Sequence, residues 1–218
     1  MGLIYQKELP GNTKVGVWRI DESETDLLGR LQLSQAERAH IDQFKDTKRY
    51  LHWLGSRVLL RTMIDTDEFI ELKTFSNQRP KLLNFPYHVS ISHSHEMAAV
   101  AISPKNELGI DIEWLHEKVL RVKHKFLHPT EISALNGLSN SKAIEQATIY
   151  WCVKEAMYKW YGKRGIRFAS QLRVQQIYPG KHEADTALLD NSRKLTLPIF
   201  YEKINGYILA VGYAPPVT

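Results

Sequence analysis

The chain has 218 residues, 43% of them hydrophobic and 24% charged, with a formal net charge of +5. This is an ordinary globular composition with enough apolar material for a sizeable core, and the length allows one large domain or two small lobes. The single cysteine, Cys152, excludes an internal disulfide framework and a cysteine-rich zinc site. Its apolar, helical setting predicts a small core residue rather than a reactive thiol. The basic charge favours anionic partners, although it is also common in proteins without such partners.

No membrane or secretion signal is apparent. No stretch approaches the roughly 18 apolar residues of a transmembrane helix, and the first residues lack the basic and apolar regions of a signal peptide. Gly2 recurs in myristoylation signals, but Gln6 stands where such a signal needs Ser or Thr. We therefore expect a cytoplasmic protein without membrane partners.

The first half of the chain predicts strands around one long helical segment. Ser34 and Glu37 form a capping box, and helical periodicity continues from there, with an interruption, to about Ile64. The expected strands cover residues 15–20, 70–75, 88–92 and 97–103, with a loop at 77–80 and a turn at 93–96. The breaker cluster SPKN, residues 103–106, marks the best domain boundary.

The second half repeats this pattern. Residues 107–114 (ELGIDIEW) predict a strand, and two helical stretches follow. One helix opens near Pro129, and the longer one runs from about Lys142 to Gly162. Three further strands are expected at residues 172–177, 197–203 and 207–213. We therefore predict an α+β fold with two similar lobes, residues 1–105 and 106–218.

The strand GIDIE, residues 109–113, carries the first candidate for chemistry. Because side chains alternate along a strand, Asp111 and Glu113 share one face while Ile110 and Ile112 face the other. Neighbouring carboxylates repel each other, and a hard cation such as Mg²⁺, which takes oxygen ligands together with phosphate and water, relieves that repulsion. Alone, this pattern also fits a half-buried strand with a solvated acidic face.

The long helix in the second half carries a matching stripe. Trp151, Glu155 and Lys159 recur at i, i+4 and i+8 and therefore share one helix face. Glu155 and Lys159 could form a simple surface ion pair. Beside a tryptophan, and in a segment rich in lysine and arginine, a carboxylate for metal and an ammonium for phosphate instead fit a polyphosphate site.

A third candidate lies at the end of the strand SISHS, residues 90–94. Hydroxyls and an imidazole at a strand end can hold a phosphate through hydrogen bonds, and polar turn residues would look the same. His93 and His95 also suggest a metal pair, but no convincing third zinc ligand accompanies them. A Ser–His–Asp hydrolase is not favoured, because the G-x-S-x-G elbow is absent.

Taken in this order, the motifs resemble the 4′-phosphopantetheinyl transferase superfamily, specifically its monomeric Sfp-type. That family has a strand motif G-[IV]-D-[IVL]-E, an F-x-x-x-E element and a helix W-x-x-K-E-A/S-x-x-K. The corresponding segments here are GIDIE (109–113), FLHPTE (126–131) and WCVKEAMYK (151–159). Upstream, VSISHS (89–94) resembles the family's F-N-[ILV]-S-H-S, and LGSRVLLR (54–61) its L-x-x-R-x-L-L-R helix.

The resemblance implies a pseudo-dimer of two lobes, each with a mainly antiparallel sheet on a long helix, and an active site between them. It implies transfer of the 4′-phosphopantetheine arm of coenzyme A to a serine of an acyl or peptidyl carrier protein, with release of 3′,5′-ADP. The implied cofactor is Mg²⁺, with Mn²⁺ as a possible substitute. The implied partners are coenzyme A and an acidic carrier, with no nucleic acid, and the implied state is a monomer.

Residue by residue, the resemblance assigns the following roles. The metal ligands would be Asp111, Glu113 and Glu155. The catalytic residues would be Glu155 and Lys159, and the serine proton would pass either to Glu155 or to a metal-bound water. The residues that bind coenzyme A would be Arg57, Arg79, Ser92, His93, Asp111 and Lys159, with Arg57 at the 3′-phosphoadenosine end.

Several positions depart from the family pattern. The family loop G-K-P is replaced by Gln78, Arg79 and Pro80, and His52 lies where many members have arginine. The segment FLHPTE has one residue more between Phe and Glu than the strict element, which leaves Glu131 a structural or a carrier-facing role.

Two other functions compete with the transferase. A Mg²⁺-dependent nuclease would also use a D-x-E pair, a nearby lysine and a basic surface, but Trp114 stands where many such sites place lysine. A non-catalytic nucleic-acid-binding module has only the net charge in its favour, because no helix-turn-helix, zinc-finger or RNP signature is present.

Overall fold

The protein is described by a computed structural model that covers residues 2–45, 47–74, 79–190 and 193–215. The chain forms two compact units, Met1–Lys105 and Asn106–Thr218. Each unit contains an antiparallel sheet and a long helix, so the predicted α+β class is confirmed.

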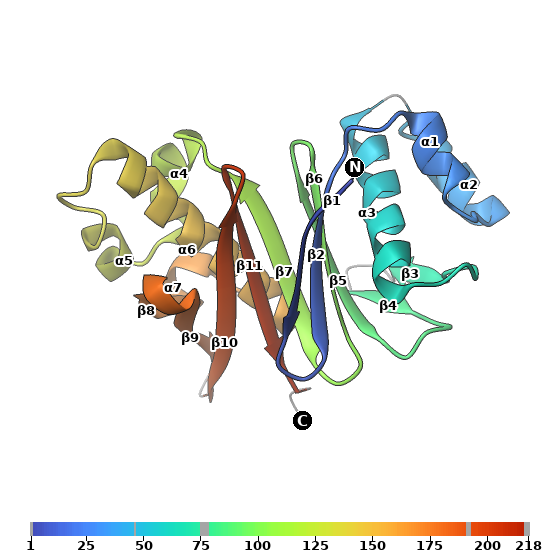
Figure 1. Cartoon of the computed structure of the whole chain (residues 1–218). Coiled ribbons are helices and arrows are strands. Elements are labelled where there is room, and N and C mark those ends of the chain that lie inside the picture. The colour runs from blue at the N-terminus through green and yellow to red at the C-terminus, as the bar shows by residue number, and fades with distance from the viewer. Residues whose placement is uncertain (1, 46, 75–78, 191–192, 216–218) are drawn as a thin grey trace. The chain divides into compact units, whose positions relative to one another are not determined.

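The sheet of the first unit has the strand order β1-β2-β6-β5-β4-β3, and all its neighbouring strands are antiparallel. Its strands are β1 (Leu3–Leu9), β2 (Thr13–Arg19), β3 (Leu72–Thr74), β4 (Pro80–Leu82), β5 (His88–Ser94) and β6 (Met97–Ser103). Its helices are α1 (Glu24–Gly29), α2 (Gln35–Asp42) and α3 (Lys48–Ile64). Figure 1 shows α3 lying along the sheet.

Helix α2 begins as predicted. The Ser34 hydroxyl accepts a hydrogen bond from the Glu37 amide, and the Glu37 carboxylate accepts one from the Ser34 amide. Helix α2 ends at Asp42, and a new helix, α3, begins at Lys48. At its start the Thr47 hydroxyl accepts a hydrogen bond from the Tyr50 amide. Each cap satisfies amides that a helix start leaves without a partner.

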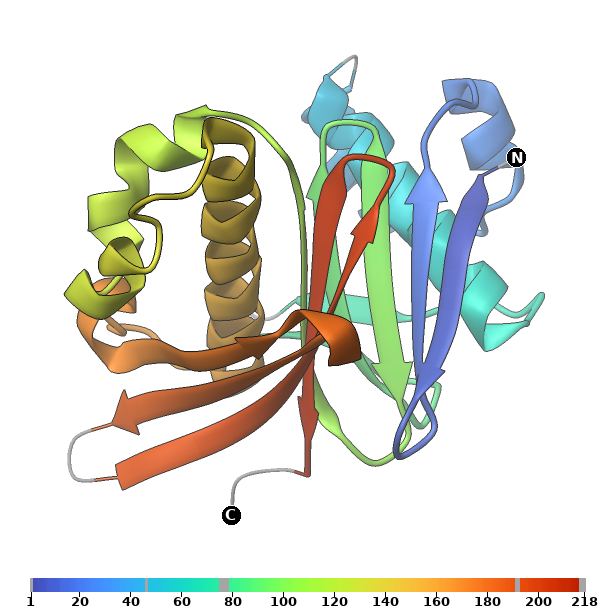
Figure 2. The same cartoon turned by 60° about the vertical axis from the view of Figure 1, so that its left-hand side comes forward.

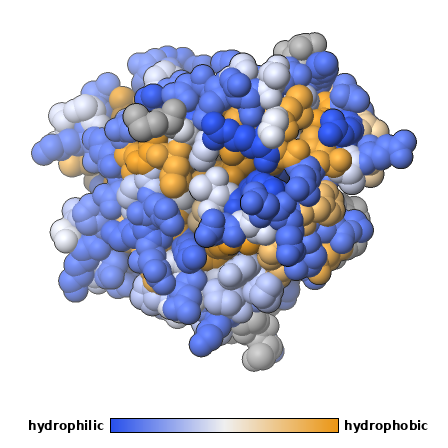
Figure 3. Space-filling model, turned by 45° about the vertical axis from the view of Figure 1, so that its right-hand side comes forward, coloured by the Kyte–Doolittle hydropathy of each residue, from blue (hydrophilic) through white to orange (hydrophobic). Residues whose placement is uncertain are grey.

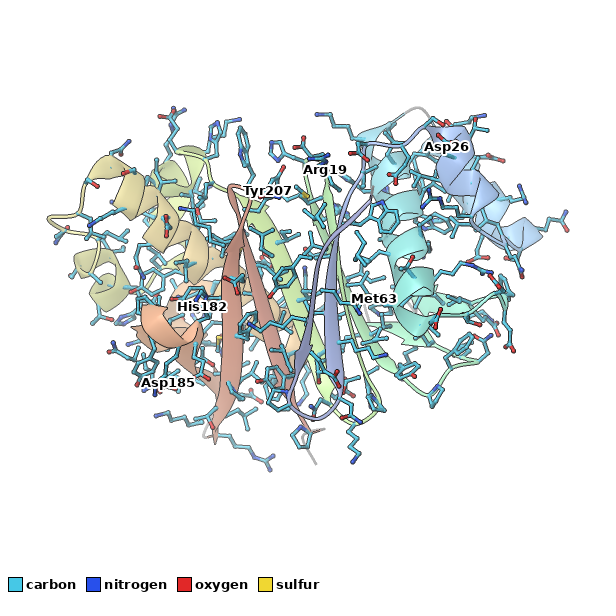
Figure 4. All side chains as sticks on the ribbon, viewed as in Figure 1. Arg19, Asp26, Met63, His182, Asp185 and Tyr207 are labelled. Atoms are coloured by element: carbon cyan, nitrogen blue, oxygen red, sulfur yellow. The ribbon has the colours of Figure 1, made fainter. Side chains whose placement is uncertain are left out.

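Helix α3 packs against β2, β5 and β6 through Leu54, Val58, Leu59 and Met63. Met63, labelled in Figure 4, explains the glycine in β2. A Cβ added to Gly16 would lie 2.8 Å from the Met63 sulfur, which is closer than such atoms approach. The helix can therefore lie close to the sheet because β2 has no side chain at this point.

The sheet of the second unit has the strand order β7-β11-β10-β9-β8 and is also antiparallel. Its strands are β7 (Glu107–Trp114), β8 (Leu172–Tyr178), β9 (Glu183–Asp190), β10 (Arg193–Ile204) and β11 (Tyr207–Ala214). Its helices are α4 (Lys118–Phe126), α5 (Pro129–Ser133), α6 (Asn140–Tyr161) and α7 (Phe168–Gln171). Figure 2 shows α6 against this sheet, of which β7 is an edge strand.

Helix α6 contacts β7, β8, β10 and β11 and ends at Gly162, which takes the left-handed conformation with φ of 70°. The helix touches β7 at Gly109, where an added Cβ would lie 1.9 Å from the Ala156 carbonyl oxygen. The glycine of the GIDIE motif therefore has a structural reason: it lets the acidic strand and the long helix meet backbone to backbone. Cys152 is fully buried in this core, as predicted.

The structure corrects several boundaries. Strand β5 extends to Ser94, so His93 lies in the strand and the turn to β6 consists of His95 and Glu96 alone. Part of the predicted strand 70–75 and of the loop 77–80 lies outside the described residues, while Pro80 opens β4. Among the described residues, the prediction omitted seven elements, namely β1, α1, β4, α4, α7, the 3-10 helix η1 (Pro179–Lys181) and β9. Most are short or carry a weak apolar pattern, and tertiary pairing stabilises such elements more than local preference does.

The surface mixes polar and apolar residues. Figure 3 shows hydrophobic patches bordered by hydrophilic residues on the face in view. The large exposed hydrophobic residues are Leu83, Trp114, Val122, Leu138, Tyr178 and Leu189. Within the described ranges, no helix is both long enough and apolar enough to span a bilayer.

Candidate active site

The two carboxylates of β7 both face helix α6. Asp111 accepts a hydrogen bond from Lys159, and Glu113 accepts one from Trp151, and both donors lie on α6. Ile110 and Ile112 alternate with them and are fully buried. The period of two therefore places the acidic pair on the helix-facing side of the strand, as the sequence predicts.

Lys159 is held in place by two acceptors of β7. Its Nζ lies 2.8 Å from Asp111 Oδ1 and 2.9 Å from the Ile110 carbonyl oxygen. The Asp111 side chain is 6% exposed and the Lys159 side chain 29%. The ammonium is thus partly open to solvent while its carboxylate partner is buried, so a ligand can reach the lysine from one side.

Trp151 fixes the second carboxylate. Its indole Nε1 donates to Glu113 Oε1 at 3.2 Å. The indole ring packs edge-on against Phe126, with ring centroids 4.9 Å apart, and lies 5.7 Å from the ring of Phe168. An indole held by two aromatic neighbours presents its N–H in a fixed direction, which orients Glu113.

Glu155 lies between Trp151 and Lys159 on the same helix face. Burial, together with the carboxylates of Asp111 and Glu113, raises the pKa of Glu155 to about 7, and Lys159 opposes that rise. The three carboxylates therefore share one electrostatic environment. Like charges in one site are the usual reason for a carboxyl group to remain partly protonated near neutrality.

The donor set of this site suits a hard divalent cation, because it consists of carboxylates only. In the structure the carboxylates are nevertheless engaged by protein donors, Asp111 by Lys159 and Glu113 by Trp151. Among the described residues, no three carboxylate, imidazole or thiol groups lie close enough together to hold a metal ion. Metal binding by these side chains would therefore require them to move closer together around the ion.

Glu131 has a structural role here. Its Oε2 accepts from the His128 amide at 2.7 Å and caps α5, and its Oε1 accepts from the Val174 amide at 2.9 Å. Lys154 Nζ lies 2.6 Å from Glu131 Oε2 and also donates to the carbonyl oxygens of Phe126 and Phe168. This buried hub, which sequence reasoning missed, joins α4, α5, α6, α7 and β8 directly beneath the site helix.

The remaining predicted site residues belong to the first unit. Arg57 and His93 line a cavity of about 850 Å³ that is bordered by α2, α3 and β3 to β5. The Arg57 guanidinium lies 3.8 Å from the centre of the Trp53 ring. Its Nε is buried without a hydrogen-bond partner among the described residues. Burial lowers the pKa of Arg57 to about 10, against the opposing effect of Glu37, so the group stays cationic at neutral pH.

The other two predicted residues of this unit are placed differently. Ile91 and His93 both line the cavity, so Ser92, which is buried, lies on the opposite face of β5. Arg79 directly precedes β4, whose first residue, Pro80, also lines the cavity. The first unit therefore brings Arg57 and His93 to one cavity and separates Ser92 from them.

The fold and site define an α+β protein in which an acidic edge strand meets a long helix that carries glutamate and lysine. Residues 107–211, which include all three carboxylates, match the family model of the 4′-phosphopantetheinyl transferase superfamily. This match covers just under half of the chain, and it confirms the resemblance to that superfamily seen in the motifs.

A curated relative points to the same family. The chain is 26% identical over 126 residues to the 4′-phosphopantetheinyl transferase gsp of Aneurinibacillus migulanus. The alignment covers 57% of this chain and 51% of the relative, so it spans about half the length of each protein. Neither comparison supports a nuclease.

Proposed function

We propose that the protein transfers the 4′-phosphopantetheine arm of coenzyme A to a serine of a carrier protein and releases 3′,5′-ADP. The observation that carries the proposal is that Asp111 and Glu113 of β7 meet Glu155 and Lys159 on one face of α6. All four residues lie within the segment that matches the family. Acid and base groups at this spacing suit chemistry on a pyrophosphate.

The metal in this proposal is Mg²⁺, with Mn²⁺ as a possible substitute. Asp111, Glu113 and Glu155 would hold it, directly or through water, because an all-carboxylate donor set suits these ions. When bound, the ion would neutralise charge on the pyrophosphate. Asp111 would then release Lys159, whose ammonium is already partly exposed and would turn to a phosphate oxygen.

The protein's own groups would handle the proton. The carrier serine attacks the β-phosphorus, a new serine O–P bond forms, and the bond from that phosphorus to the bridging oxygen breaks. The electron pair leaves with 3′,5′-ADP, and the serine proton passes to Glu155. Burial and the neighbouring carboxylates raise the pKa of Glu155 in the metal-free protein, and a bound cation would lower it, so Glu155 would be ionised and able to accept the proton.

Coenzyme A binding would also use the first unit. Arg57, Arg79 and His93 are proposed to contact the phosphates at the cavity, with Arg57 at the 3′-phosphoadenosine end, while a phosphate contact of Ser92 would have to lie on the other face of β5. Arg57 supports this role because it is cationic, lines the cavity and has a buried Nε without a partner in the described part of the chain. A buried donor without a partner is costly, and a phosphate oxygen would satisfy it.

The carrier is proposed to be acidic. Helix α4 is rich in basic residues and also presents Val122 to solvent, close in sequence to the exposed Trp114. The basic residues are Lys118, Arg121, Lys123, His124 and Lys125. A basic helix with exposed apolar side chains suits an acidic amphipathic helix, both for steering and for docking. We propose that the protein acts as a cytoplasmic monomer.

The test is incubation with coenzyme A, Mg²⁺ and a panel of purified apo carrier proteins, followed by intact-mass measurement of each carrier. We expect a mass increase of one phosphopantetheine arm on at least one carrier and formation of 3′,5′-ADP in equal amount. No transfer to any carrier, together with robust cleavage of DNA or RNA, would refute the proposal and favour the nuclease hypothesis instead.

A further inference from the structure

Two histidines of the first unit form a stacked pair beside the cavity. His52 lies on α3 and His93 on β5, and their ring centroids are 4.3 Å apart with an angle of 18° between the ring planes. His52 Nε2 also makes a hydrogen bond with the backbone carbonyl oxygen of His95. Because a carbonyl oxygen can only accept, Nε2 of His52 carries a proton and Nδ1 is the nitrogen that can remain bare.

The hydrogen bond ties α3 to the tip of the β5–β6 hairpin. His95 is the first residue of the two-residue turn and has a positive φ of 51°. Two-residue hairpins need a positive φ at this point, which a residue other than glycine adopts at a cost. The His52 contact therefore holds a strained turn from outside the hairpin, two residues beyond His93.

The cavity meets only one member of the pair. His93 lines it together with Trp53 and Arg57, whereas His52 is not among the described residues of its wall. His52 covers one face of the His93 ring, and the exposed His93 side chain borders the cavity. The stack therefore restricts the rotamers that an exposed side chain at this position can adopt.

We propose that His52 is a positioning residue that orients His93 for a phosphate group in the cavity. The inference rests on the proposed binding of coenzyme A by His93. The hydrogen bond from His52 Nε2 to the His95 carbonyl fixes the His52 ring, and the stack places that ring against one face of His93. A fixed ring restricts the orientation of His93, whose imidazole can then donate a hydrogen bond to a phosphate oxygen in the cavity.

Two variants separate the parts of this arrangement. His52→Phe keeps a ring for stacking and loses the donor to His95, while His52→Gln keeps a donor and loses the stack. We expect His52→Ala to weaken coenzyme A binding about tenfold and each of the two conservative variants to recover part of that loss. In steady-state transfer, most of the change should fall on KM for coenzyme A rather than on kcat. His88→Ala, at the other end of β5, is the matched control.

A double-mutant cycle decides whether His52 acts through His93. In a His93→Ala background, His52→Ala should change the dissociation constant of coenzyme A by less than twofold, as measured by titration calorimetry. An undiminished tenfold loss in that background would overturn the proposal, because His52 would then act on the ligand without His93.

Nuclear magnetic resonance of the ligand-free protein separates this proposal from the proposed function. The imidazole proton signals of His93 should carry a ring-current shift from His52 that disappears in His52→Ala and persists in His88→Ala. Signals of His93 that are the same in both variants would overturn the stack as a positioning device. If the shift is present but the wild-type protein does not bind coenzyme A, the proposed function fails and the positioning role for a phosphate ligand fails with it.

Discussion

Helix α6 carries two lysine–carboxylate pairs five residues apart, and they differ in exposure. The Lys154 and Glu131 side chains are 0% and 3% exposed, and Lys154 reaches three acceptors. The Lys159 side chain is 29% exposed, and its ammonium donates to Asp111 and to the Ile110 carbonyl oxygen. Protein oxygens have replaced the water around the Lys154 ammonium, whereas the Lys159 ammonium still contacts solvent on one side.

This difference in exposure distinguishes a structural lysine from a candidate functional lysine on the same helix. A fully buried ion pair costs much to break, since the remaining charge has neither water nor a partner. A pair with one partly exposed member costs less to break, because water can solvate that member. Lys154 therefore has a structural role, whereas Lys159 can exchange Asp111 for a ligand. The four predictions below test this distinction.

The largest effect is expected for Lys154→Met. The change leaves the Glu131 carboxylate buried without its cation, and we expect it to lower the free energy of unfolding by about 3–5 kcal/mol. Urea denaturation followed by circular dichroism measures this loss. The double variant Lys154→Met with Glu131→Gln removes both charges and should regain a substantial part of it. A double variant no more stable than Lys154→Met would show that the charge is not the cause.

The second prediction concerns the rate of transfer rather than the free energy of unfolding. Asp111→Ala removes a proposed metal ligand, and we expect the transfer rate to fall by at least about 100-fold. Lys159 loses a partner in this variant but is partly solvated, so the melting temperature should fall by only a few degrees. Intact-mass assays of the carrier and thermal melting provide the two readouts. Unchanged transfer by a folded Asp111→Ala protein would refute the assigned metal site.

The contrast between the two lysines also shows what the sequence could reveal. Asp111, Glu113, Glu155 and Lys159 were predictable, because strand and helix periods alone place them on common faces. Glu131 was not, since its partner Lys154 is 23 residues away and its second amide, from Val174, is 43 residues away. Contacts of that range depend on how helices and strands pack, which no local pattern encodes.

The absence of long-range packing from local patterns also explains the errors in the predicted fold. The capping box of Ser34 and Glu37 involves neighbouring residues and was predicted correctly. Strand β9, by contrast, begins with EADT and has little alternation of apolar residues, yet it lies between β8 and β10. Pairing on both sides stabilises such a strand whatever its own preference. The stack of His52 on His93 was missed for a related reason, because it joins α3 to β5 across a sequence separation that no motif spans.

A moderate effect on stability is expected from Glu155→Gln in metal-free protein. The pKa of Glu155 is raised from 4.5 to about 7 by burial and by the neighbouring carboxylates. The folded protein therefore holds a proton that the unfolded chain releases at lower pH, and wild-type stability falls as pH rises from about 4.5 to 7. Glutamine has no such dependence, so the variant should gain roughly 1–2 kcal/mol over wild type at pH 8 and nothing at pH 4.

Urea denaturation in EDTA at both pH values measures the gain for Glu155→Gln, and Glu145→Gln serves as a control at an exposed glutamate of the same helix. An equal gain at pH 4 and pH 8 would contradict the raised pKa.

The last prediction, for Lys159→Met, completes the comparison with Lys154→Met. The buried Asp111 carboxylate loses its cation, so the free energy of unfolding should fall by about 1–2 kcal/mol, less than in Lys154→Met because the Lys159 side of the pair is already partly solvated. Coenzyme A binding should nevertheless weaken at least about tenfold, because the proposed phosphate contact is gone. Titration calorimetry and urea denaturation of the same preparation give both values. A Lys159→Met protein as unstable as Lys154→Met, with coenzyme A affinity unchanged, would reverse the roles assigned to the two lysines.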